Sequence, residues 1–168
     1  MGSYSEIAND DYILREVGDA DSVTIIGCPY CENQSIAYDK GISIIGESSF
    51  GELRSKVYIK TQEADRIKNL LEENGKSADV NIFEFLPWGQ CWQNAKDRRA
   101  IAKARENSEA AIVLNCFDGC ERIKSAFPES FKVIPGMFNV GTIVLSSLSR
   151  REELLWITPK LKCTISKT

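Results

Sequence analysis

The chain of 168 residues contains no histidine. Histidine is the commonest general base near neutral pH and a frequent metal ligand, so a metal site here must depend on thiolate ligands. The sequence also lacks a G-x-G-x-x-G fingerprint, a phosphate-binding P-loop and a Ser/His/Asp set, which leaves independent hydrolase or nucleotide-binding chemistry without support. No apolar run approaches the ~20 residues that a membrane helix needs, so we expect no membrane span.

The chain also lacks a large excess of either charge. It has 21 Lys and Arg and 24 Asp and Glu residues, so its formal net charge is only −3. That balance predicts no general attraction to nucleic acid or to anionic membranes. The first segment, from Met1 to Tyr12, is polar and acidic and does not resemble a secretory signal. We therefore expect a cytoplasmic protein, in which cysteines are usually thiols or metal ligands rather than structural disulfides.

Short apolar runs alternate with helical patterns along the chain. Strands are expected at 22–26, 42–46, 56–60, 79–86, 110–116, 131–135 and 142–148, with a last extended piece at 160–166. Helices are expected at Tyr4–Val17, at 31–41, at 62–75 with Thr61 as its N-cap, at 93–107, at 119–127 and at 150–157. This alternation predicts a single α/β domain over residues 1–168, with a mostly parallel sheet covered by helices on both faces in a Rossmann-like, three-layer arrangement.

Most of the six cysteines follow an expected strand. Cys28 and Cys31 follow the strand at 22–26, Cys91 follows the strand at 79–86, and Cys116 ends the strand at 110–116, with Cys120 four residues later. The carboxyl ends of parallel strands share one edge of a sheet, where open α/β sheets build their sites. Four thiolates suit tetrahedral zinc, so Cys28, Cys31, Cys91 and Cys116 are the predicted ligands. Cys120 is an alternative ligand or a separate reactive thiol, and an iron–sulfur cluster would use the same ligand type.

Two other interpretations of the cysteines stay open. The tetrapeptide from Cys28 to Cys31, CPYC, also occurs after a strand in glutaredoxins, where the first cysteine is a nucleophile activated at a helix N-terminus and the second resolves the mixed disulfide. A thiol–disulfide oxidoreductase is therefore the alternative function. A free cysteine can also be a small buried apolar residue, which is our interpretation of Cys163 and an alternative for Cys116.

The segment Ala110–Ser146, AAIVLNCFDGCERIKSAFPESFKVIPGMFNVGTIVLS, resembles the C-terminal, zinc-binding-type domain associated with bacterial methylenetetrahydrofolate reductases. In that family a strand ends in cysteine and is followed by a glycine-containing turn, a helix, and a strand that closes on proline before a loop of small residues. The matching residues of the chain are Cys28, Cys31, Cys91, Arg98, Arg99, Cys116, Gly119, Phe127, Pro128, Val133, Pro135 and Gly136. The resemblance covers about residues 20 to 146; Cys120 is an addition to the family pattern.

The resemblance implies a metal-binding accessory domain linked to one-carbon metabolism or electron delivery, rather than a complete enzyme. Its expected partners are a flavin-bearing reductase or a corrinoid one-carbon protein. Its expected cofactor is zinc, with an iron–sulfur electron-transfer module as the alternative.

Overall fold

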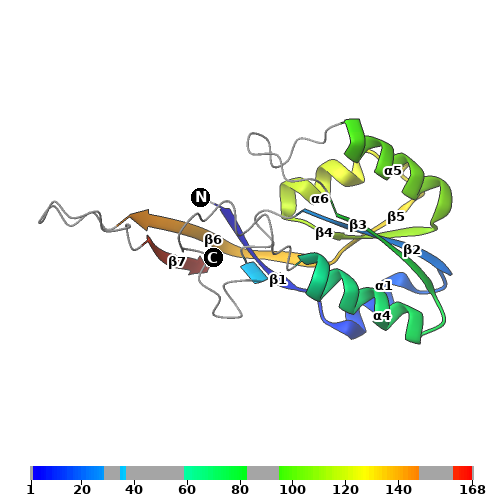
Figure 1. Cartoon of the computed structure of the whole chain (residues 1–168), viewed down its shortest axis with the longest axis horizontal. Helices are drawn as coiled ribbons and strands as arrows, with labels where there is room; N and C mark the ends of the chain where they lie inside the picture. The colour runs from blue at the N-terminus through cyan, green and yellow to red at the C-terminus, as the bar shows by residue number, and fades with distance from the viewer. Residues whose placement is uncertain (1, 29–34, 37–58, 83–94, 148–160, 168) are drawn as a thin grey trace, which may run out of the picture.

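The computed structural model describes residues 2–28, 35–36, 59–82, 95–147 and 161–167. Two sheets lie within these ranges: a parallel sheet of four strands in the order β3-β2-β4-β5, and an antiparallel sheet of three strands in the order β1-β6-β7. Figure 1 shows the parallel sheet between two layers of helices, and the antiparallel sheet extending to one side of it. The predicted α/β class with a helix-flanked parallel sheet is confirmed, whereas the antiparallel sheet was not predicted.

The strands of the parallel sheet are β2 (Ser22–Gly27), β3 (Ser77–Ile82), β4 (Ala110–Leu114) and β5 (Lys132–Pro135). The strands of the antiparallel sheet are β1 (Gly2–Ile7), β6 (Met137–Ser147) and β7 (Leu161–Lys167). The helices are α1 (Asp10–Val17), α4 (Asp65–Glu73), α5 (Ala95–Asn107) and α6 (Phe117–Lys124), with the π-helix η1 (Ile59–Ala64) before α4. No helix in the described ranges is both long and apolar enough to cross a bilayer.

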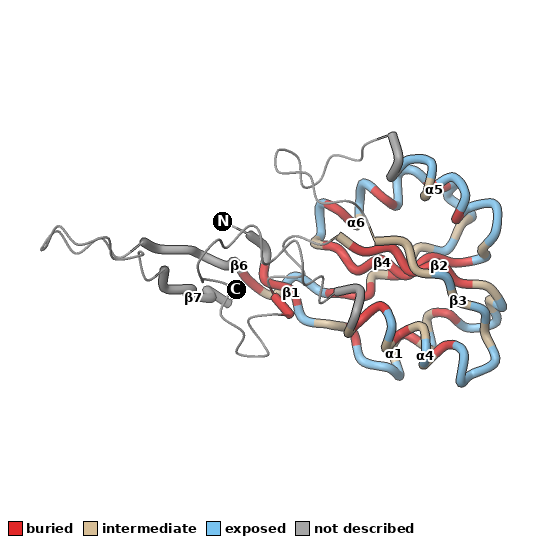
Figure 2. The backbone as a smooth tube through the Cα atoms, in the orientation of Figure 1, coloured by how far each residue is buried: buried red, intermediate tan, exposed pale blue. Residues whose placement is uncertain are grey.

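Side chains of the central strands alternate between two hydrophobic cores. Ile25 of β2 and Ile112 of β4 belong to the larger core, while Ile26 and Val113 belong to the smaller one. A strand that buries both faces needs a continuous apolar run, because successive side chains point to opposite sides. The runs at β2 and β4 meet that condition, and Figure 2 shows both strands as buried in the middle of the parallel sheet.

Within the described residues, helices lie on both faces of the parallel sheet. The larger core lies under α1 and α4, which contribute Ile13, Val17, Ile67 and Leu71. The smaller core lies under α5 and α6, which contribute Ile101 and Ile123. The buried residues of α1 and α4 are four apart, as expected for one face of a helix packed on a sheet. Each core therefore forms between one sheet face and the helices that cover it.

The structure contradicts the helix predicted for the first segment of the chain. Tyr4–Val17 was expected to be one helix, but the residues up to Ile7 form β1 and the helix α1 begins only at Asp10. The Asn9 side chain accepts a hydrogen bond of 2.8 Å from the backbone N–H of Tyr12 and so caps the helix at that point. β1 pairs antiparallel with β6, a partner from the far end of the sequence, so local periodicity did not reveal it.

The start of α4 differs from the prediction as well. Thr61 was expected to cap the helix, but it lies inside η1, whose turns run directly into α4 at Asp65. Ala64 occupies the position before α4 in a helical conformation and makes no side-chain cap. The strand expected at 56–60 is contradicted at its last two residues, which belong to η1, and its first three lie outside the described residues.

The remaining expected elements have mixed outcomes. The strands at 22–26, 110–116 and 131–135, and the helices at 93–107 and 119–127, are confirmed to within a few residues. The strand at 79–86 begins earlier, at Ser77, and is described up to Ile82. The run at 142–148 lies in β6 as far as Ser147, where it joins the antiparallel sheet together with β7, and residue 148 lies outside the described residues. Residues 42–46 and 150–157 lie outside the described residues, as does most of 31–41, of which Ser35 and Ile36 are helical.

Gly136 connects the two sheets. It lies between β5 and β6, its N–H donates to the Val113 carbonyl at 2.9 Å, and its own carbonyl accepts from the Ala8 N–H at 3.0 Å. A Cβ on Gly136 would lie 2.7 Å from Cδ2 of Leu114 and 2.9 Å from Cγ2 of Ile112. Only glycine therefore lets the chain pass this close to β4, and the passage joins β4 to the segment between β1 and α1.

Candidate functional site

The strand order of the parallel sheet reverses between β2 and β4, and the carboxyl ends of these two strands form the edge considered first. After β2 the chain forms β3 on one side of it, and then returns to form β4 on the other side. Helices that leave neighbouring strands in opposite directions part at such a point, and ligands of open α/β sheets bind there. The residues that follow β2 and β4 are therefore the first candidates for a site.

Cys28 and Cys116 both lie at this edge. Cys28 directly follows β2, and its N–H donates to the carbonyl of Leu114, the last residue of β4, at 3.2 Å. Cys116 lies two residues beyond Leu114, at the N-cap position of α6. Both cysteines are partly buried. The parallel pairing of Gly27 with Leu114 thus brings two of the four predicted zinc ligands to adjacent strand ends.

The other predicted ligands cannot be placed in the same way. Cys31 and Cys91 lie outside the described residues. Within the described ranges, no three Cys, Asp or Glu side chains come together in a group able to hold a metal ion. Cys163 lies on β7, opposite Leu145 of β6, and so belongs to the antiparallel sheet. The four-cysteine zinc site stays a prediction for which the structure places Cys28 and Cys116.

Cys120 lies in the next turn of α6. Its N–H donates to the Cys116 carbonyl at 2.8 Å, and its side chain packs against the smaller core. Burial raises the pKa of the Cys120 thiol, and the neighbouring Glu121 carboxylate raises it further, against a smaller opposing effect of Lys124. A thiol that resists ionisation is a poor nucleophile and a poor metal ligand at neutral pH, so Cys120 is the weakest of the three described candidates.

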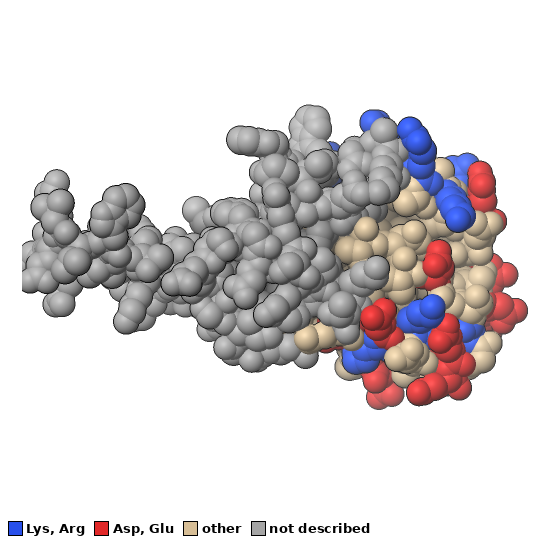
Figure 3. All heavy atoms as spheres, in the orientation of Figure 1, with Lys and Arg blue, Asp and Glu red and all other residues tan. Residues whose placement is uncertain are grey.

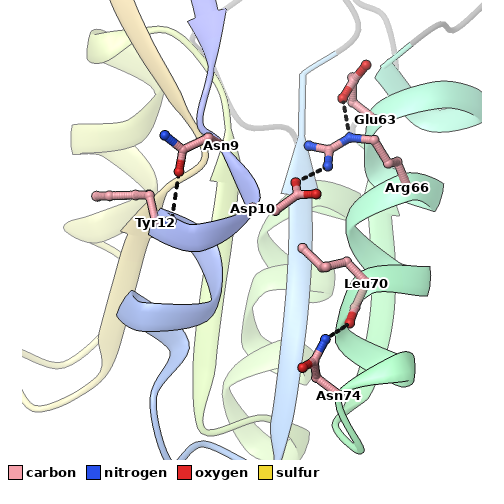
Figure 4. A network of polar contacts seen from close by, with 7 residues as sticks. All are labelled: Asn9, Asp10, Tyr12, Glu63, Arg66, Leu70 and Asn74. Carbon is pink, nitrogen blue, oxygen red and sulfur yellow. Dashed lines mark hydrogen bonds and ion pairs between the residues drawn. The ribbon is translucent and has the colours of Figure 1, made fainter.

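A polar network holds the start of α1 against the start of α4 (Figure 4). The Arg66 guanidinium donates through Nε to Glu63 at 2.9 Å and through Nη1 to Asp10. Glu63 lies in η1 and is only 7% exposed. Burial opposes the charge on Arg66, but hydrogen bonds to Glu63 and Asp10 outweigh burial and raise the pKa of Arg66. This network lies beside a shallow hollow lined by Ile7, Ala8, Asn9, Asp10, Asp11, Glu63 and Arg66.

A separate cavity lies at the amino end of the parallel sheet. It is lined by the first residues of β2 and β3, Ser22 and Ser77, and by Asn107 and Ser108 at the end of α5. Cys28 and Cys116 lie at the other end of the parallel sheet, so this cavity is not part of the candidate site. Figure 3 shows acidic and basic side chains interspersed over the described part of the visible face, in keeping with the small net charge of the chain.

Sequence reasoning missed Asn115 among the residues at this edge. It lies between β4 and Cys116, is only 5% exposed, and its Oδ1 accepts no hydrogen bond from any residue that the structure describes. One signal was present, because Asn115 is a polar residue that interrupts the apolar run directly before Cys116. The ion pair between Arg66 and Asp10 had no such signal, since the two residues are separated by 56 positions in the sequence.

Replacing Arg66 by methionine should lower the free energy of unfolding by about 1 to 2 kcal/mol, because the buried Glu63 carboxylate loses its partner. Lys68→Met is the matched control on the same helix, where the exposed pair with Glu72, at 3.6 Å, should contribute less than about 0.5 kcal/mol. Urea denaturation of both variants measures the difference. Equal effects of the two substitutions would contradict the assigned role of Arg66.

A variant that keeps Cys120 as its only cysteine should react slowly with iodoacetamide. Its thiolate should form only at a pH above the ordinary thiol range, because burial raises its pKa. The rate of alkylation measured against pH should therefore have a midpoint above that of glutathione under the same conditions. A midpoint at or below that of glutathione would show that Cys120 is a reactive thiol.

Comparison of the chain with protein-family models, with curated proteins and with solved structures finds no match.

Proposed function

We propose that the chain is a metal-binding accessory domain, in which Cys28, Cys31, Cys91 and Cys116 hold one zinc ion at the carboxyl edge of a Rossmann-like, three-layer fold. The observation that carries the proposal is the position of Cys28 and Cys116 at the ends of the adjacent strands β2 and β4. Sulfur ligands from separate strands can then surround one ion, as tetrahedral zinc requires. Because the chain contains no histidine, cysteine thiolates are the ligands that it can offer to zinc.

The donor set fits zinc better than it fits a hard cation. Cys28 and Cys116 are partly buried, so their thiols lie close to the low-dielectric interior while staying accessible at the strand ends. Zinc bound there would hold both thiols as thiolates and would cross-link β2 to β4. The distance between the two thiols is set by the protein, because backbone pairing of Val23 to Gly27 with β4 fixes the relative positions of the two strand ends.

By the resemblance, this domain would assist electron delivery in one-carbon metabolism, with a flavin-bearing reductase or a corrinoid protein as its partner. We place it in the cytoplasm, where thiols stay reduced and can keep a metal. The glutaredoxin-like alternative uses only Cys28 and Cys31, and gives no role to the second thiol, Cys116, at the same edge. An iron–sulfur cluster would use all four thiolates and differs from zinc in its visible absorption.

Metal analysis of the freshly purified full chain tests the proposal. The wild type should carry about one zinc ion per chain, and Cys28→Ser and Cys116→Ser should each reduce this to near zero. Cys163→Ser is the matched control, since it removes a cysteine of β7 in the other sheet and should retain the metal. Circular dichroism of every variant checks that the fold is kept.

Three results would contradict zinc binding by these thiols. The first is a wild-type chain that takes up no zinc either as purified or on titration. The second is an unchanged zinc content in both Cys28→Ser and Cys116→Ser. The third is iron and sulfide with visible absorption, which would establish the cluster instead. A reducible Cys28–Cys31 disulfide that is indifferent to Cys116→Ser would support the oxidoreductase alternative.

A further inference from the structure

The cavity at the amino end of the parallel sheet lies between α5 and the strands β2 and β3, and its volume is about 200 Å³. Helix α5 lines it with four residues that are spaced as one stripe of a helix: Ala100, Lys103, Ala104 and Asn107. Strand β3 lines it with three residues at alternate positions: Ser77, Asp79 and Asn81. The cavity is therefore formed by one face of a helix and one face of a strand.

The face of β3 that borders the cavity is polar, whereas the other face of the strand is apolar. On that other face, Ala78, Val80 and Ile82 pack against the larger core. The smaller core, on the side of α5, includes no residue of β3 among those that the structure describes. The polar face of β3 therefore borders open space instead of a core, and the small side chains of Ala100 and Ala104 fill little of that space.

Two opposite charges line the cavity from its two walls, the Asp79 carboxylate on β3 and the Lys103 ammonium on α5. Neither charge forms an ion pair, with the other or with any further residue in the described ranges. Asp79 is positioned by Asn81, whose Nδ2 donates to Asp79 Oδ2 at 3.3 Å and to Oγ1 of the buried Thr24 at 3.1 Å. The cavity thus offers an anion and a cation on separate walls, and each still lacks an oppositely charged partner.

We propose that this cavity binds a small zwitterion, a molecule of the α-amino acid type that carries both an ammonium and a carboxylate group. The ligand ammonium would donate to the Asp79 carboxylate, and the ligand carboxylate would accept from the Lys103 ammonium. A ligand with a single charge would pair with only one of the two walls. Pockets for drug-sized ligands have volumes of roughly 300–1,000 Å³, so a cavity of about 200 Å³ suits a smaller molecule.

This site shares no residue with the zinc proposal and does not depend on it. The zinc proposal uses Cys28 and Cys116, which lie at the other end of the parallel sheet. A metal-free chain that keeps its fold should therefore bind the zwitterion as well as the zinc-loaded chain does, so either proposal can fail without the other.

Titration of the ¹⁵N-labelled full chain with L-serine, followed by NMR, tests the site. Two analogues of L-serine separate its charges, because ethanolamine lacks the carboxylate and 3-hydroxypropanoate lacks the ammonium. L-Serine should shift the backbone signals of Ser77, Asp79 and Ser108 in a saturable way. Each analogue should bind about tenfold more weakly than L-serine, as expected for the loss of one charged hydrogen bond.

Two substitutions remove the charges of the cavity one at a time. Asp79→Asn should weaken L-serine binding about tenfold without weakening the binding of 3-hydroxypropanoate. Lys103→Met should weaken L-serine binding by a similar factor without weakening the binding of ethanolamine. Both side chains are exposed, so neither change should unfold the chain. Asp118→Asn and Lys124→Met are the matched controls, since they make the same changes at exposed positions of α6 outside the cavity and should leave L-serine binding unchanged.

The proposal is overturned if neither L-serine nor glycine causes a saturable shift, which would make the cavity a solvent-filled groove only. It is also overturned if either single-charge analogue binds as tightly as L-serine, because one charge would then be enough. An affinity for L-serine that is the same in the wild type, Asp79→Asn and Lys103→Met would show that these two charges bind no ligand.

Discussion

The parallel pairing of β2 with β4 is the contact on which the rest of the molecule depends. It places Gly27 beside Leu114, and the hydrogen bond from Cys28 N–H to the Leu114 carbonyl extends the pairing past the end of β2. Both strands are buried on two faces, so their register is held by packing as well as by hydrogen bonds. The relative positions of Cys28, Asn115 and Cys116 follow from this register.

Three sets of contacts hold β6, α1 and α4 beside the parallel sheet. Gly136 carries the chain from β5 into β6 while its backbone bonds to β4 and to the segment before α1. Tyr12 of α1 packs edge-on against Phe138 of β6, with ring centroids 5.2 Å apart. Arg66 ties α4 to α1 through Glu63 and Asp10. The two sheets, α1 and α4 therefore meet near the carboxyl end of β4.

The strands of the parallel sheet could be predicted because each is marked by an apolar run in its own local sequence. A β-branched apolar run at 22–26 has few alternatives to a buried strand, and the position of Cys28 after it follows directly. The antiparallel sheet was not predictable, because β1 is a strand only through its pairing with β6. Glu63 lies in the π-helix η1 and pairs with Arg66, which also pairs with Asp10. No spacing rule predicts a π-helix, or a partner of Arg66 as distant as Asp10. Asn115 was visible as a polar residue in an apolar run, but only the contact with Gly119 shows where its side chain lies.

The closeness of Cys28 and Cys116 can be measured directly with dibromobimane, which becomes fluorescent when it bridges two thiols. A chain that keeps only these two cysteines should form an intramolecular bridge rapidly and in high yield. The matched chain with only Cys28 and Cys163 should not, because Cys163 pairs with Leu145, near the far end of β6 from Gly136. Equal bridging in the two chains, or none between Cys28 and Cys116, would contradict the arrangement of strands that brings the two thiols together.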